Sequence, residues 1–237
     1  MRPPTASALN RRSAIDVSNP LAEFYANPDP RCPCVLVLDT SKSMRGPRID
    51  ELNRALTAFR DDLLGDSLAA QRVEIAVITF GTEVVLAQGF VTPDGLMVEP
   101  LRARGQTQMA PALHQAIDLI EHRRALYKQA ALPCYTPWVF LITDGRPHAG
   151  FCPEMRRAAE RIAEGEKRRS LAFYAVGVEG ADLSVLAQVS VRPPVKLQGI
   201  KFNEMFVWLS HSLRTVSRSR LEERAALPPL TGWAEAP

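Results

Sequence analysis

The chain has 237 residues and is 46% hydrophobic, enough for one sizeable domain with its own core and too little for two large ones. The formal net charge of +3 and the lack of aromatic residues among the basic doublets argue against nucleic-acid binding. No stretch is apolar enough for a membrane helix, and residues 1–19 lack the apolar core of a secretory signal. We therefore expect a cytoplasmic protein with no membrane partner, whose cysteines are thiols.

The first third of the chain predicts a lead-in, a strand and a helix. Residues 1–30 are rich in Pro, Ser, Arg and Asn and are expected to be partly disordered. Pro28, Pro30 and Pro33 oppose a helix or a central strand at the end of this lead-in. A buried strand is predicted over 34–39, and a helix with one apolar face follows between Pro47 and Gly65.

The remaining elements alternate between strands and helices. The tight turn Gly81-Thr82 joins strands at 73–80 and 83–87, which must therefore be antiparallel, and we place this hairpin at the sheet edge. Residues 89–105 show no regular pattern. Helices are then predicted at 109–128, 153–169, 183–189 and 202–216, with strands at 137–143 and 171–178 and an edge strand near 195–197.

This order predicts an α/β fold, with a doubly wound, mostly parallel sheet, one antiparallel edge strand and helices on both faces. The folded domain is expected over 31–217. Residues 218–237 have no periodic pattern and are predicted to form a loose or extended tail.

Polar side chains follow two of the predicted strands at the point where each strand ends. Asp39 closes the first apolar run, and Ser41 and Ser43 come two and four residues later. Asp144 closes the strand at 137–143, and Thr107 lies directly before the helix at 109–128. The carboxyl ends of parallel strands meet at one sheet edge, where open α/β sheets bind ligands. We therefore expect these five residues to lie close together.

This set of ligands indicates a hard divalent cation. Oxygen-only ligands favour Mg²⁺, Mn²⁺ or Ca²⁺ over zinc. Two carboxylates and three hydroxyls balance the charge of such a cation without excess negative charge. The cation should therefore accept one more anionic oxygen, which a Glu or Asp of a partner protein can supply.

The segment Asp39-Thr40-Ser41-Lys42-Ser43 resembles the Asp-x-Ser-x-Ser element of von Willebrand factor A (VWA) domains. Thr107 and Asp144-Gly145 fall where that family has the Thr and the second Asp of its metal-ion-dependent adhesion site (MIDAS). The resemblance spans about 34–216. It implies a VWA fold, direct metal contacts from Ser41, Ser43 and Thr107, and acids that often act through water.

Three further segments resemble the bacterial single-domain subgroup that is similar to the tellurium-resistance protein TerY and to YegL. They begin at Arg31, Pro137 and Phe206. This resemblance implies a stress-response or tellurium-resistance-like pathway, with partners that include a kinase and a phosphatase.

Basic residues surround the predicted ligands. Lys42 stands where the subgroup often has Gly, and Arg146-Pro147-His148-Ala149 replaces its usual Pro-Thr-Asp. Together with Arg45, the side chains of Lys42, Arg146 and His148 would form a basic rim. We interpret this rim as a preference for an acidic partner segment.

Other interpretations of the same residues remain open. Ser and Asp often cap backbone groups in turns, and Thr107 could be a helix N-cap. A phosphoester hydrolase with an aspartyl nucleophile would need a second Asp where Ser41 stands, and neither a Gly-x-Ser-x-Gly motif nor a phosphate-binding Gly-rich loop is present. We therefore expect a binding module rather than an enzyme. A scaffold with a structural metal site is the remaining alternative.

The cysteines carry no predicted chemistry. Cys32, Cys34 and Cys134 are expected at the sheet edge opposite the metal, and Cys152 at the metal edge. Cys-x-Cys is not a usual zinc spacing, so inert thiols are expected, with a disulfide or a metal site as alternatives.

Overall fold

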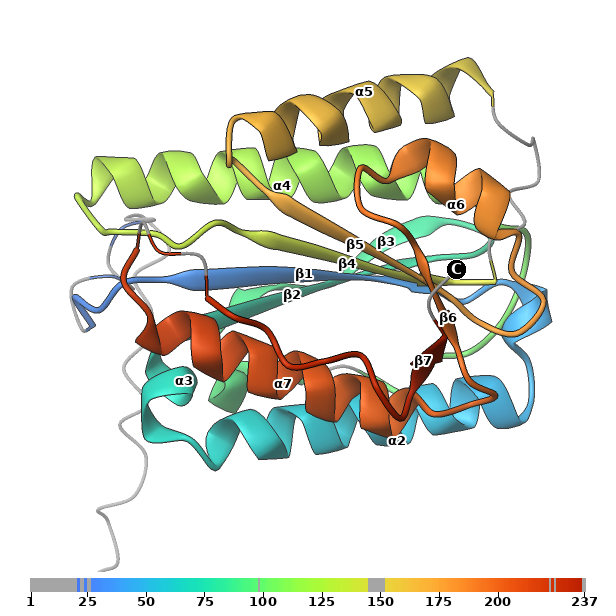
Figure 1. Cartoon of the computed structure of the whole chain (residues 1–237), viewed down its shortest axis with the longest axis horizontal. Coiled ribbons are helices and arrows are strands. Elements are labelled where there is room, and N and C mark those ends of the chain that lie inside the picture. Colours follow the sequence, from blue (N-terminus) through green and yellow to red (C-terminus); the bar gives the residue numbers. More distant parts are fainter. Residues whose placement is uncertain are drawn as a thin grey trace, which may run out of the picture.

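The computed structural model describes residues 21, 24, 27–97, 99–144, 152–221, 223 and 225–235. These residues form a seven-stranded mixed sheet between two layers of helices (Figure 1). The strands are β1 (Cys32–Asp39), β2 (Val73–Phe80), β3 (Val84–Val91), β4 (Trp138–Thr143), β5 (Ala172–Gly177), β6 (Val195–Leu197) and β7 (Ala234–Glu235). Their order across the sheet is β3-β2-β1-β4-β5-β6-β7.

Helices cover both faces of the sheet. They are α2 (Pro47–Leu64), α3 (Ser67–Arg72), α4 (Met109–Gln129), α5 (Pro153–Lys167), α6 (Leu183–Val189) and α7 (Phe202–Arg218), with the 3-10 turns η1 (Lys42–Met44) and η2 (Pro93–Gly95). Figure 1 shows α4, α5 and α6 on one face and α2, α3 and α7 on the other. None of the helices in the described ranges combines the length and the apolar character needed to cross a bilayer.

β1 lies inside the sheet between β2 and β4, and all eight of its residues are buried. Successive side chains point to opposite faces. Leu36 and Leu38 therefore join the core under α2 and α7, while Val35 and Val37 join the core under α4 and α5. A run of apolar residues without polar alternation is what a strand covered on both faces requires.

The predicted doubly wound, mostly parallel sheet is confirmed, and so is the antiparallel hairpin at one edge. Some elements differ from the prediction. β3 continues to Val91, into residues predicted to be irregular. The short helix α3 was not predicted; the Asp66 carboxylate caps it by accepting bonds from the amides of Leu68 and Ala69. α5 ends at Lys167, two residues early.

The expectation that Pro33 excludes a central strand is wrong. Pro33 lies within β1 and pairs with Glu74 of β2. Arg31, two residues earlier, directs its amide and carbonyl toward residues 133–135, so Pro33 faces that same side. Pairing of β1 with β4 begins only at Cys34, so Pro33 precedes this ladder and its missing N–H interrupts no bond within it.

The C-terminal segment contributes an ordered strand. β7 pairs antiparallel with β6, so β6 is not the edge strand that was expected. Trp233, which precedes β7, is 2% exposed and packs on Trp208 of α7 with ring centroids 5.5 Å apart. The Trp208 indole also donates a bond to the Pro228 carbonyl at 2.9 Å. These contacts attach the segment to the second core face.

A buried ion-pair cluster lies at the amino-terminal end of β2. The Glu74 carboxylate is within 2.9 Å of the Arg31 guanidinium and 2.8 Å of that of Arg123, and the Tyr127 hydroxyl donates to it. The Phe24 ring, 3% exposed, lies against the Arg123 guanidinium at 4.8 Å. Phe24 thereby attaches the lead-in to the domain, while most of residues 1–30 lies outside the described residues.

All four cysteines are free. Cys32 and Cys34 are fully buried, and burial raises the pKa of both thiols, which keeps them protonated. Cys134 lies near the same end, where it pairs with Arg31 through an isolated bridge.

Candidate metal site

The Asp39 carboxylate is held at the carboxyl end of β1. Its side chain is fully buried, and both oxygens are engaged. Oδ1 accepts a bond from the Ser41 amide at 2.8 Å, and Oδ2 accepts one from the Thr143 hydroxyl at 2.6 Å. The parallel register sets the second contact, because Leu38 pairs with Ile142 and the next residues on the two strands are Asp39 and Thr143. Thr143 was not among the predicted site residues.

The loop after Asp39 brings two hydroxyls together. Ser41 Oγ and Ser43 Oγ are 2.9 Å apart. Ser41 is almost completely buried and Ser43 is exposed, so the pair spans from the interior to the surface. Met44, at the end of η1, is fully buried and anchors the loop on the core.

The loop that carries Thr107 is bonded to the Asp39 loop. The Arg104 amide donates to the Thr40 carbonyl at 2.7 Å, and the Lys42 amide donates to the Gly105 carbonyl at 3.0 Å. Gly105 has φ of 79°, and a Cβ there would lie 2.4 Å from the Thr82 amide nitrogen. Only glycine fits this close approach without strain.

Thr107 itself is buried, with 8% exposure. The N-cap position of α4 is occupied by Gln108, which makes no side-chain cap bond. Helix capping therefore does not account for Thr107, and its hydroxyl has no such role to compete with metal binding.

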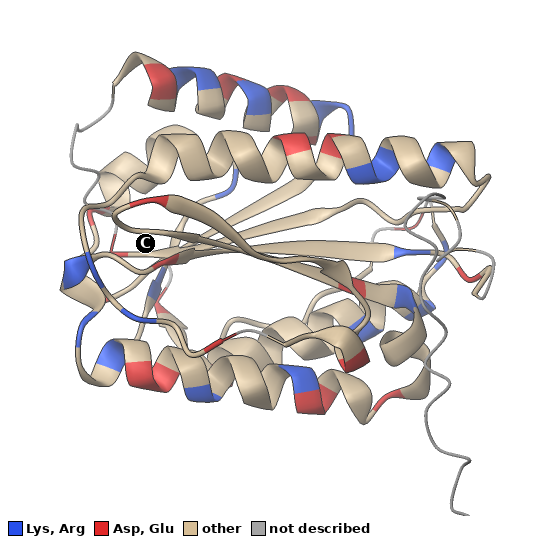
Figure 2. Ribbon diagram, turned by 180° about the vertical axis from the view of Figure 1, so that it is seen from behind, with Lys and Arg blue, Asp and Glu red and all other residues tan. Residues whose placement is uncertain are grey.

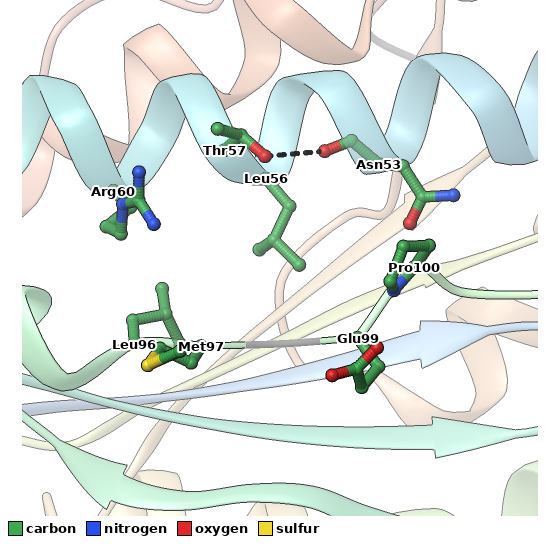
Figure 3. Close-up of a pocket in the computed structure, with 8 residues that line it drawn as sticks. All are labelled: Asn53, Leu56, Thr57, Arg60, Leu96, Met97, Glu99 and Pro100. Atoms are coloured by element: carbon green, nitrogen blue, oxygen red, sulfur yellow. Dashed lines mark hydrogen bonds between the residues drawn. The ribbon is translucent and has the colours of Figure 1, made fainter.

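A side-chain clamp holds the start of this loop on α2. The Asn53 amide nitrogen donates to the Leu101 carbonyl at 3.0 Å, and the Asn53 oxygen accepts from the Leu101 amide at 2.8 Å. Figure 3 shows Asn53 beside a pocket of about 270 Å³ between α2 and a segment that contributes Leu96, Met97, Glu99 and Pro100. None of the candidate ligands lines this pocket.

Asp144 directly follows β4 and is 4% exposed. Its Oδ1 atom is buried and has no hydrogen-bond partner among the residues that the structure describes. A buried carboxylate oxygen without a donor is costly in free energy.

The surroundings of Asp39 change the pKa of its carboxyl group. Burial raises the pKa of the Asp39 carboxyl to about 6, although the bonds from Ser41 and Thr143 oppose the shift, and the negative charge of Asp144 adds to it. The described residues contain no cluster of three or more His, Cys, Asp or Glu side chains that could hold a metal. Any cation at this edge would therefore depend on hydroxyl oxygens beside the two carboxylates.

Basic residues lie around this end of the sheet (Figure 2). Lys42 and Arg45 are exposed, and Arg45 Nε donates to the Ala103 carbonyl at 3.2 Å. Arg48 donates to the Ser43 carbonyl at 3.1 Å, and Arg104 is exposed on the Thr107 loop. Arg48 and Arg104 were not predicted as rim residues, although both are close in sequence to predicted ligands. Arg146 and His148 fall outside the described residues.

Residues 34–146 match the family model of the von Willebrand factor type A domain. The fold also resembles solved structures at low identity. Manganese-loaded Plasmodium vivax TRAP protein is 16% identical, with 76% of this chain and 73% of that chain covered and a TM-score of 0.54. The von Willebrand domain of the type V pili tip protein Mfa5 from Porphyromonas gingivalis is 10% identical, with 81% and 98% covered and a TM-score of 0.58.

Proximal thread matrix protein 1 from the mussel byssus, solved with a zinc-occupied MIDAS motif, is 16% identical with a TM-score of 0.54. The match covers 78% of this chain and 48% of the mussel chain, so our chain spans about half of that protein. Among curated proteins the sequence has no match. The family match supports a VWA domain over residues 34–146, and the solved structures share the fold of this chain.

Proposed function

We propose that this chain is a VWA domain that binds a divalent cation through Asp39, Ser41, Ser43, Thr107 and Asp144, and a partner protein through that cation. The observation that carries the proposal is the buried Asp144 oxygen, which has no donor in the described part of the chain. It lies beside Asp39, whose pKa is raised mainly by burial and further by the negative charge of Asp144. A cation supplies the positive charge that this arrangement lacks.

Each residue has a distinct part in this proposal. Ser41, Ser43 and Thr107 offer neutral hydroxyl oxygens to the cation, and Asp39 and Asp144 offer charge, directly or through water. Thr143 holds Asp39 in position through its hydroxyl. When bound, the cation acts as a Lewis acid that accepts an anionic oxygen from outside.

The partner would contribute a Glu or Asp side chain to the cation. Lys42 and Arg45, exposed beside the site, would attract acidic residues that flank this ligand. Among cations we favour Mg²⁺, with Mn²⁺ or Ca²⁺ as alternatives, because the ligands are all oxygens. The related structures that name a metal contain manganese and zinc.

The setting that we propose follows the TerY-like resemblance. It is a cytoplasmic, bacterial stress-response or tellurium-resistance-like pathway with a kinase and phosphatase among the partners. In that setting the chain acts as a binding module and not as an enzyme.

The deciding experiment has two stages. Titration calorimetry with Mg²⁺ and Mn²⁺ should detect binding to the wild type and none to Asp39→Ala. Partner capture from a bacterial lysate should then require the cation and be lost with EDTA and in Asp39→Ala. Asp61→Ala is the matched control, because Asp61 is an exposed acid at the far end of α2.

Two outcomes would contradict the proposal. Capture that survives both EDTA and Asp39→Ala would indicate a scaffold with a structural metal site. Turnover of generic phosphoesters that Asp39→Ala abolishes would indicate a hydrolase.

The basic rim has its own test. The double variant Lys42→Glu with Arg146→Glu should weaken partner affinity and change its salt dependence, because reversed charges repel an acidic segment. Arg168→Glu, an exposed residue just beyond α5, is the control. Unchanged affinity and salt dependence in the double variant would refute the role of the rim.

A further inference from the structure

The outer edge of β3 is open. β3 is the last strand on its side of the sheet, so its outer side pairs with no strand in the described part of the chain. Residues 84–91 include neither a charged residue nor a proline. Figure 2, which views the molecule from the side of β3, shows no charge along this strand. Natural edge strands commonly carry charges or prolines that prevent pairing with another chain.

The hydrogen-bond pattern of the hairpin shows which backbone groups face outward. The Gly81 amide donates to the Glu83 carbonyl at 3.1 Å, and Thr79 pairs with Val85. Bonded and non-bonded pairs alternate along an antiparallel ladder. Val85 therefore bonds to β2, whereas the amides and carbonyls of Val84 and Leu86 point to the free edge.

Apolar side chains accompany these free groups. Val85 is 44% exposed and Leu86 is 40% exposed. Neighbouring residues of a strand point to opposite faces of the sheet. A strand added to this edge would therefore find an apolar contact on each face.

The opposite edge of the sheet lacks these properties. β7 has only two residues, and its Glu235 carboxylate lies 3.6 Å from the Lys196 ammonium of β6. A short, charged edge of this kind resists pairing. The difference singles out β3 as the surface available to a further strand.

We propose that two copies of this chain associate by antiparallel pairing of their β3 edges about a two-fold axis at Val85. Val84 of each copy then pairs with Leu86 of the other, which forms about four backbone hydrogen bonds. A second copy is the best occupant because an uncharged strand meets its own copy without like-charge repulsion and offers no charge to select a different partner.

The interface is small. The register of β3 against β2 shifts between Leu86 and Gln88, and this bulge ends the regular edge. We therefore expect a weak dimer whose population rises with protein concentration. Neither the cation nor its ligands lie in this interface, so dimerisation persists in EDTA and its failure would leave the proposed function untouched.

Sedimentation velocity over a range of concentrations tests the proposal. The wild type should shift toward dimer, and Val85→Lys should weaken association at least about tenfold because it places two ammonium groups directly opposite each other. Val207→Lys is the matched control, since Val207 is 49% exposed on α7. Val85→Thr, which keeps a β-branched uncharged side chain, should still dimerise.

Residue-resolved hydrogen exchange identifies the edge directly. The amides of Val84 and Leu86 should exchange more slowly at high than at low protein concentration, whereas the Val85 amide should be protected at both. A monomer at every concentration would overturn the proposal and leave the edge to a strand of another protein. Dimerisation that Val85→Lys does not weaken would overturn it as well.

Discussion

Buried acids have different partners at the two ends of the sheet. At the amino-terminal end, Glu74 contacts the guanidinium groups of Arg31 and Arg123 and accepts a bond from Tyr127. At the carboxyl-terminal end, Asp39 is bonded by an amide and a hydroxyl, and one Asp144 oxygen has no donor within the described residues.

The difference shows where the chain supplies its own countercharge and where it does not. A buried carboxylate is stable only when it is paired and hydrogen-bonded. Glu74 receives its countercharge from Arg31 and Arg123, so we assign it a structural role. Asp39 and Asp144 form a pair of like charges, and the compensation they need would come from a bound cation.

Glu74→Ala gives the largest expected effect. It removes the buried anion that contacts the guanidinium groups of Arg31 and Arg123, and we expect a loss of about 3–5 kcal/mol in the free energy of unfolding. Chemical denaturation measures it. Glu51→Ala removes the partner of a largely exposed arginine and should cost at most about 1 kcal/mol. Equal losses in the two variants would show that the buried ion pairs stabilise the fold no more than the exposed pair does.

Addition of a divalent cation should have the second-largest effect on the free energy of unfolding. At a concentration of about 100 times Kd, it should stabilise the wild type by about 2.7 kcal/mol. Asp39→Asn should abolish this gain. It should also make the cation-free protein more stable than the cation-free wild type, because it removes a charge that is disfavoured mainly by burial and further by the negative charge of Asp144. Thermal unfolding with Mg²⁺ and with EDTA measures both. If the cation-free Asn variant were less stable than the cation-free wild type, the Asp39 charge would not be the destabilising feature inferred here.

Thr143→Val tests whether the Thr143 hydroxyl holds the Asp39 carboxylate in position for cation binding. The variant keeps the volume and removes the hydroxyl, and the expected loss of cation affinity is about tenfold to a hundredfold. Calorimetric titration of Mn²⁺ measures it. Thr57→Val, which removes an exposed hydroxyl bonded within α2, is the control and should leave affinity unchanged. The same affinity in Thr143→Val and the wild type would remove Thr143 from the site.

Lys42→Glu gives the smallest effect on stability. Lys42 is exposed, so the free energy of unfolding should change by no more than about 0.5 kcal/mol while partner affinity falls. Chemical denaturation and a binding assay on one preparation measure the stability and the partner affinity separately. A large loss of stability would mean that Lys42 has a structural role.

Much of the fold followed from local pattern. The apolar run at β1 and the turn at Gly81-Thr82 predicted a central buried strand and an antiparallel hairpin, and both are confirmed. Pro33 and β7 were misjudged because proline tolerance and pairing of a two-residue strand depend on neighbours that are distant in the sequence.

Most of the candidate site could be predicted from the sequence, because its residues are close in sequence or end neighbouring strands. Asp39, Ser41 and Ser43 lie within one loop, and strand order alone places Asp144 at the same edge. Thr143 was missed because its hydroxyl gains a role only when β4 lies beside β1 in this register. The function of the site stays a prediction.

By itself, the sequence determined the elements, the two-sided burial of β1 and the acids and hydroxyls that end its strands, because these depend on residue type and short-range spacing. Only the tertiary structure decided which buried acid is neutralised. Glu74 meets guanidinium groups from 43 and 49 positions away in the chain, whereas Asp39 meets a second acid. Charge compensation depends on distance in space, and that distance exists only after the sheet has formed.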